Sequence, residues 1–147
     1  MRGMNRDASE TLDGFDRTRV TVALGPLVEP VLARVVGIHA ARAELPLDRL
    51  NDAVLVADAV AARARAFTVG DRLPLSVRSG RGRLELRIGP LRSGGGRGML
   101  EGAALPTIGS VIERLADTVR VRTGAGGDEY LVIRIDAGHA QPESTHP

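Results

Sequence analysis

The stretch RLPLSVRSGRGRLELRI, residues 72–88, contains two runs in which apolar and polar side chains alternate. Alternation with a period of two is typical of a strand that buries one face and exposes the other. The residues between the runs, 79–82, read SGRG, and their glycines suit a tight turn. The stretch therefore predicts an antiparallel β-hairpin.

The same alternation predicts strands on both sides of this hairpin. One strand precedes it and ends at Gly25, and two more flank GAGGD, which suits a second hairpin turn. Apolar residues at helical spacing predict three helices, and Asp48 is a suitable N-cap for the second. The expected strands are residues 20–24, 118–123 and 129–136, and the expected helices are residues 26–45, 49–66 and 105–117.

Strands joined by hairpins, together with separate helices, are typical of an α+β protein. We expect a two-layer sandwich in which three helices cover one face of a mostly antiparallel sheet of about five strands. The 147 residues fit a single domain, which we place at 18–136. Residues 1–17 and 137–147 lack any pattern and are expected to be flexible tails.

The composition excludes several classes of protein. The chain has no cysteine, which excludes disulfides and thiolate metal sites and suits a reducing cytoplasm. No run approaches the ~20 apolar residues of a membrane span, and the first residues carry no apolar signal-peptide core. We therefore expect a cytoplasmic protein without a membrane partner.

The charge is unevenly distributed along the chain. The formal net charge is only +2, but between Arg63 and Arg97 nine arginines accompany two acidic residues, Asp71 and Glu85. This excess favours an acidic partner or a phosphate, although an arginine stripe is also typical of a solvated sheet face. Aromatic residues make up only 2%, which argues against nucleic acid because bases would have few rings to stack on.

The three histidines show no metal-ligand spacing. His39 lies on the apolar face of the first expected helix, which is typical of a hydrogen-bonded core histidine. His139 and His146 lie in the C-terminal tail without companion ligands. We expect no metal site.

Two segments, ELPLDRLNDAVLVADAV (44–60) and IGSVIERLADTVRVRTGAGGDEYLVIRID (108–136), resemble the anti-sigma-factor serine kinases of bacteria. These kinases belong to the histidine-kinase-like ATPase superfamily, which also includes type II topoisomerases and a heat-shock chaperone. The resemblance covers roughly residues 19–136. It implies a similar fold, and partners such as sigma factors and small anti-anti-sigma domains.

The chain departs from the motifs of that family. Where the family has a catalytic Glu and, four residues later, an Asn that ligates Mg²⁺, this chain has Asp58 and Ala62. Asp58 keeps a carboxylate and is the candidate catalytic base; the alternative is a salt bridge to an arginine such as Arg65. Ala62 has no oxygen for a metal. The family's adenine-binding Asp is replaced by Ile88–Gly89, and its helix-entry glycines are reduced to Gly109.

The segment LRSGGGRGML, residues 91–100, lies where the resembled fold has its nucleotide lid. If a nucleotide binds, the resemblance implies backbone contacts from glycines and anion contacts from two arginines. These candidate nucleotide-binding residues are Arg92, Arg97, Gly94, Gly95, Gly96 and Gly109. The alternative interpretation is a mobile connection, because the segment matches neither common phosphate-loop motif.

The sequence therefore predicts a regulatory protein-binding module, a degenerate anti-sigma-factor-like domain that docks a sigma factor or an anti-anti-sigma partner. ATP binding is expected to be weak or lost, and no cofactor is expected. The alternative is an active anti-sigma serine/threonine kinase that uses ATP and magnesium. Pairing of two copies as a homodimer stays open, and nucleic-acid binding is the weakest hypothesis.

Overall fold

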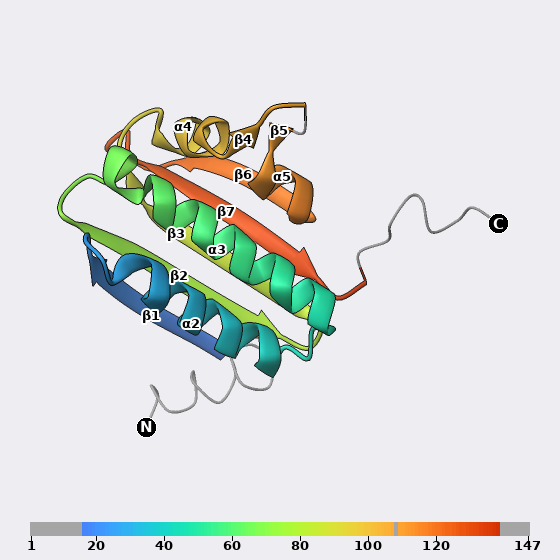
Figure 1. Cartoon of the computed structure of the whole chain (residues 1–147). Coiled ribbons are helices and arrows are strands. Elements are labelled where there is room, and N and C mark those ends of the chain that lie inside the picture. The colour runs from blue at the N-terminus through green and yellow to red at the C-terminus, as the bar shows by residue number, and fades with distance from the viewer. Residues whose placement is uncertain (1–15, 108, 139–147) are drawn as a thin grey trace, which may run out of the picture.

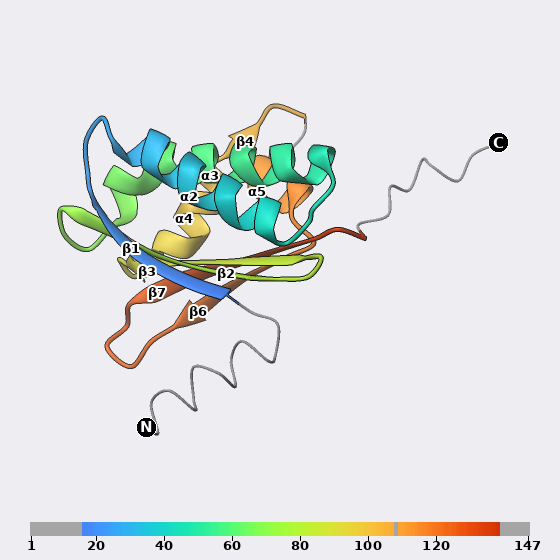
Figure 2. The same ribbon diagram turned by 90° about the horizontal axis from the view of Figure 1, so that it is seen from below.

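The chain folds into one sheet with helices on one of its faces (Figures 1 and 2). The computed structural model describes residues 16–107 and 109–138. The five strands lie in the order β1-β2-β3-β7-β6, and every neighbouring pair is antiparallel. Their bounds are β1 Asp16–Ala23, β2 Arg72–Gly80, β3 Arg83–Leu91, β6 Thr118–Thr123 and β7 Glu129–Asp136.

Four helices of the described residues cover the sheet from one side (Figure 2). The two long helices, α2 and α3, lie side by side (Figure 1). The two short helices, α4 and α5, lie over β6 and β7, and a small two-stranded sheet, β4-β5, packs against them. The expected α+β sandwich is thus confirmed. The bounds are α2 Val28–Arg42, α3 Leu47–Phe67, α4 Gly95–Gly102, β4 Ala104–Leu105, β5 Gly109–Ser110 and α5 Val111–Leu115.

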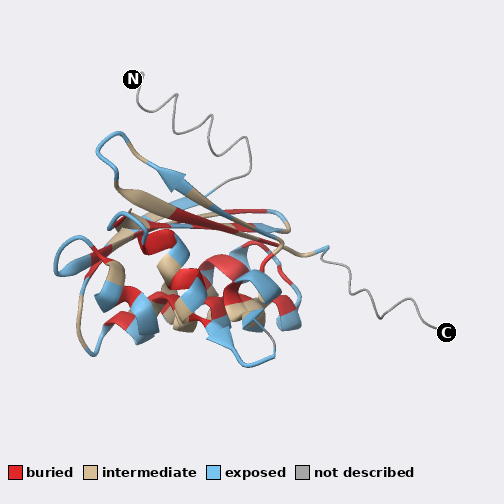
Figure 3. Cartoon of the chain, turned by 90° about the horizontal axis from the view of Figure 1, so that it is seen from above, coloured by how far each residue is buried: buried red, intermediate tan, exposed pale blue. Residues whose placement is uncertain are grey.

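The alternation in residues 72–88 places leucine, valine and isoleucine side chains against the helices and polar ones on the opposite face. The buried side chains form one core between the two layers (Figure 3). Burial of such aliphatic side chains contributes roughly 1.5–3 kcal/mol each. The core side chains of the three central strands are Leu73, Leu75, Val77, Leu84, Leu86, Ile88, Leu91, Leu131, Ile133 and Ile135.

Helix α3 begins two residues earlier than expected, at Leu47 instead of Arg49. Its N-cap is Pro46, whose ψ of 159° is extended, and Leu47 is already helical. Asp48 is therefore not the N-cap, and its side chain instead accepts a hydrogen bond from the backbone N–H of Arg49 (2.9 Å). A carboxylate in the first turn still interacts favourably with the positive end of the helix dipole.

The helix expected at residues 105–117 is much shorter, because only Val111–Leu115 is helical. Gly109 has a φ of 84° and belongs to β5, which pairs with β4. A left-handed residue cannot continue an α-helix, so α5 begins after it and uses Ser110 as its N-cap. The prediction that Gly109 lies inside a helix is wrong.

The expected tails lie almost entirely outside the described residues. Asp16 and Arg17, which we assigned to the N-terminal tail, belong to β1. Ala137 is the first residue after β7, and its backbone N–H donates to the carbonyl of Gly82 (2.9 Å).

Arg49 is buried, with 3% of its surface exposed, and joins three parts of the fold. Its guanidinium donates to the Asp52 carboxylate (2.7 Å) and to the Asp117 carboxylate (2.8 Å). It also donates to the backbone carbonyls of Leu115 (3.1 Å) and Asp136 (3.0 Å). The N-terminal turns of α3 are thereby tied to the α5–β6 connection and to the end of β7.

Replacing Arg49 with methionine is expected to lower the free energy of unfolding by about 2–4 kcal/mol, because the partly buried carboxylates of Asp52 and Asp117 and two backbone carbonyls lose their donor. Urea denaturation measures this loss. Arg34→Met, at an exposed position of α2, is the control and should change stability by less than about 0.5 kcal/mol. Equal stability of the two variants would contradict the assigned role.

His39 is buried on α2, with 2% of its surface exposed. Its Nδ1 lies 2.8 Å from the Ser79 hydroxyl, and its Nε2 lies 2.6 Å from the Thr18 hydroxyl. Burial lowers the pKa of His39, the charge of Arg42 lowers it further, and Asp16 partly offsets these effects. The expected core histidine is confirmed, and it links α2 to β1 and β2.

The lowered pKa makes stability depend on pH. The unfolded chain, with a histidine pKa near 6.5, binds the proton more readily than the folded protein. The contribution of neutral His39 to the free energy of unfolding is therefore complete above this pH and decreases as the pH drops below it. We expect the free energy of unfolding to fall between about pH 7.5 and pH 5.5, and to fall less in His39→Gln. Urea denaturation at several pH values checks this, and identical pH dependence in both proteins would refute it.

Candidate functional site

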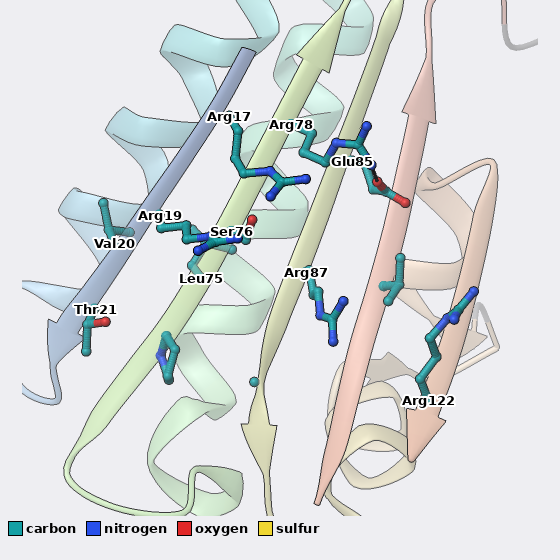
Figure 4. Close-up of a pocket in the computed structure, with 13 residues that line it drawn as sticks. Arg17, Arg19, Val20, Thr21, Leu75, Ser76, Arg78, Glu85, Arg87 and Arg122 are labelled. Atoms are coloured by element: carbon teal, nitrogen blue, oxygen red, sulfur yellow. Dashed lines mark hydrogen bonds and ion pairs between the residues drawn. The ribbon is translucent and has the colours of Figure 1, made fainter. Parts of the chain in front are cut away.

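The face of the sheet away from the helices carries a hollow of about 580 Å³ (Figure 4). The side chains around it come from all five strands of the main sheet. Five arginines and one glutamate line it, so these charged groups sum to +4. Its lining residues are Arg17, Arg19, Val20, Thr21, Pro74, Leu75, Ser76, Arg78, Glu85, Arg87, Gly89, Arg122 and Val132.

One end of this face is largely neutralised within the fold. Arg78 lies 3.5 Å from the Glu85 carboxylate, directly opposite it on the neighbouring strand. Arg134 donates to Asp136 (3.0 Å), and this hydrogen bond raises the pKa of Arg134 above its ordinary value. Arg78 and Arg134 therefore have anionic neighbours of their own.

The adjoining part of the face is not neutralised. Within residues 16–107 and 109–138, no carboxylate lies within ion-pair distance of Arg19, Arg87, Arg120 or Arg122. The Arg87 guanidinium instead stacks on the Tyr130 ring, 4.4 Å from its centroid. Four cations thus stay available to an anionic partner.

The sequence pointed to part of this surface. The excess of arginine between residues 63 and 97 includes Arg78 and Arg87, but the neighbouring arginines come from β1 and β6, far away in the chain. The signal for them was the alternation itself, because DRTRVTVA and TVRVRT each place two arginines at spacing two.

The glycine segment at residues 91–100 is not a loop throughout, because helix α4 begins at Gly95. Gly94, with a φ of 80°, is its N-cap. The next glycines allow close packing: a Cβ at Gly96 would lie 2.7 Å from Val121 Cγ1, and one at Gly98 would overlap the Phe67 ring. The interpretation as a mobile connection is therefore wrong for residues 95–100.

The positive end of α4 is occupied by a group of the chain itself. The backbone N–H of Gly96 donates to the Glu129 carboxylate (2.9 Å). Free N–H groups at a helix N-terminus are where phosphates commonly bind. A phosphate at Gly96 would have to displace this carboxylate.

The other candidate nucleotide-binding residues make separate contacts. The Arg92 guanidinium donates to the Thr68 carbonyl (3.1 Å), and Arg97 is exposed without an ion pair in the described part of the chain. Gly109 lies in β5 and is exposed.

Asp58 is half-buried on α3. Its side chain makes no hydrogen bond or ion pair to the described residues, so the alternative pairing with Arg65 does not form. Ala62, one turn later, is exposed. The role of Asp58 as a catalytic base stays a prediction.

No three potential metal ligands come together among residues 16–107 and 109–138. In the same part of the chain, we find no helix with the length and apolar character needed to cross a membrane.

Comparison with known proteins identifies a fold but no family. No family model and no curated protein matches the sequence. Among solved structures, a chain of the SiaB–SiaC complex from Pseudomonas aeruginosa is similar, with a TM-score of 0.55 and 10% identity. The match covers 90% of this chain and 96% of that chain. At this identity the likeness shows the fold alone, and membership of the kinase family stays a prediction.

Gly96→Ala is expected to lower the free energy of unfolding by about 1–3 kcal/mol, because the added Cβ collides with Val121 and crowds Glu129. Alanine is a better helix former than glycine, so without the collision the substitution would stabilise α4. A loss of stability therefore indicates the close packing. Gly70→Ala is the control, since nothing lies within 4 Å of its Cβ position. A stabilised Gly96→Ala protein in thermal unfolding would contradict the close packing of α4.

Proposed function

We propose that this chain is a regulatory protein-binding module whose Mg·ATP chemistry is weak or lost. The observation that carries this proposal is the hydrogen bond from Gly96 to Glu129, which uses the helix N-terminus that a phosphate would need. With that position filled, the feature best suited to binding is the arginine-lined hollow on the open sheet face.

Two further positions support the loss of nucleotide chemistry. Ile88, which stands where the resembled family has its adenine-binding acid, is fully buried in the core. A pocket without a hydrogen-bonding group for the base loses much of its selectivity. Ala62 offers no oxygen to Mg²⁺.

The proposed partner is a protein. The similar solved chain comes from a complex of two named proteins, SiaB and SiaC. The resemblance to anti-sigma kinases extends the proposal to a sigma factor or an anti-anti-sigma domain as the partner, in the cytoplasm. A homodimer remains a second form of association to test.

An active serine/threonine kinase is the competing function. The half-buried carboxylate of Asp58, which has no partner among the described side chains, favours it. In that case ATP and magnesium would bind near Asp58, with Arg92, Arg97 and the glycines of α4 around the phosphates. The Glu129 side chain would then have to leave Gly96.

Mg·ATP at millimolar concentration is expected to leave the melting temperature unchanged. A ligand at a hundredfold excess over its Kd would stabilise the folded state by about 2.7 kcal/mol, which thermal-shift titration detects readily. Asp58→Asn separates the two functions, and Asp48→Asn, exposed on the same helix, is its matched control. A rise that Asp58→Asn abolishes and Asp48→Asn preserves would establish nucleotide binding and overturn the proposal.

A second experiment tests the protein-binding part of the proposal. A partner captured by the full chain is identified, purified and titrated against the chain with and without Mg·ATP. We expect a saturable one-to-one complex whose Kd does not depend on the nucleotide. Failure of every captured protein to bind after purification would refute the docking role.

A further inference from the structure

Strand register places the arginines of the open face in a regular pattern. One row across the sheet reads Arg19, Ser76, Arg87, Val132 and Arg120, in the order β1-β2-β3-β7-β6. Neighbouring strands are ~4.8 Å apart, so arginines on alternate strands are about 10 Å apart. Between them lie the short side chains of Ser76 and Val132.

The next row continues the same surface. Thr21 pairs with Pro74 and Tyr130 pairs with Arg122, again without a carboxylate, while the pairing of β3 with β7 is irregular between Ile88 and Leu91. Gly89 and Pro74 line the hollow, and Figure 4 shows Arg17, Arg19, Arg87 and Arg122 around it. The hollow is therefore a basin whose lining combines small residues with cations.

We infer that this basin and the arginine row that crosses it bind an acidic segment of a protein partner, laid across the strands. Its carboxylates contact Arg19 and Arg87, which line the basin, and Arg120, which continues the row beyond the lining on β6. The inference rests on the proposed protein-binding function and names the surface and the partner's chemistry. Guanidinium groups pair with carboxylates through two parallel hydrogen bonds, so each arginine of the row can hold one acidic side chain.

The spacing of the row fits a polypeptide. Acidic residues at every third position of a segment in the polyproline II conformation lie on one side of it, about 9 Å apart, which matches arginines on alternate strands. The short side chains of Ser76 and Val132 leave room for the segment's intervening residues. Charge complementarity and spacing thus both favour an acidic polypeptide segment as the occupant of the basin.

A nucleic acid fits this surface less well. Sequence-tolerant binding of single strands needs exposed aromatic rings for bases to stack on. Tyr130 is the one aromatic residue in these rows, and the Arg87 guanidinium already covers its ring at 4.4 Å.

The test uses the full chain and a fluorescent peptide of about 12 residues with glutamate at every third position. Anisotropy titration in about 50 mM salt measures its Kd, because these exposed charges are screened at higher salt. A peptide with glutamine at the same positions and an oligothymidine of equal charge are the comparison ligands. We expect the glutamate peptide to bind most tightly.

Arg19→Gln/Arg120→Gln removes two cations of the row and is expected to weaken peptide binding about tenfold. The matched control is Arg34→Gln/Arg65→Gln, which removes the same charge from exposed positions on α2 and α3. The control should change the Kd less than about twofold. Unchanged thermal unfolding of both variants shows that they remain folded.

Three results would overturn the inference: no peptide binding, equal weakening by both double variants, or tighter binding of the oligothymidine through the same arginines. Binding of the purified partner from the docking experiment to the Arg19/Arg120 variant distinguishes failure of this inference from failure of the proposed function. If that partner binds the Arg19/Arg120 variant as well as the unmodified chain, the docking function stands and the basin is not its site. If the peptide binds the basin but no protein partner exists, the docking function fails.

Discussion

The buried guanidinium of Arg49 is the interaction on which the arrangement of the second half of the chain depends. It ties the start of α3 to two carboxylates and two carbonyls, including groups at the end of α5 and the end of β7. Asp117 accepts from Arg49 and also from the backbone N–H of Asp136 (2.6 Å). Because a buried charge must be fully partnered, these segments hold each other in register.

That register determines which side chains meet on the open face. Antiparallel pairing of β7 with both β3 and β6 places Arg87, Val132 and Arg120 in one row, although they are far apart in the chain. A shift of one residue in β6 would turn its arginines toward the helices. The cationic basin is thus a consequence of strand order and register. Glu85 and Asp136 neutralise cations at one end of the open face, and the other end stays positive.

The sequence predicted the five main strands, the two long helices and the buried His39, because each has a clear period of apolar residues. It failed where tertiary packing overrides local preference. Glycine is a poor helix former, so α4 could not be predicted from residues 95–102; its glycines are required by contacts with Phe67 and Val121. Only part of the arginine row could be predicted from the sequence, because the register that aligns Arg19 and Arg120 with Arg87 joins strands that are distant in the chain. The role of Asp58 remains a prediction.

The arginines of β1 and β6 have a consequence for how copies of the chain behave in solution. These are the two outer strands of the main sheet, and each carries a pair, Arg17 with Arg19 and Arg120 with Arg122. An outer strand is a template for pairing with another chain, and charged side chains discourage such contacts. Two copies that met strand to strand would bring these like charges together, so the pattern that draws in an acidic partner also protects the sheet from aggregating through its edges.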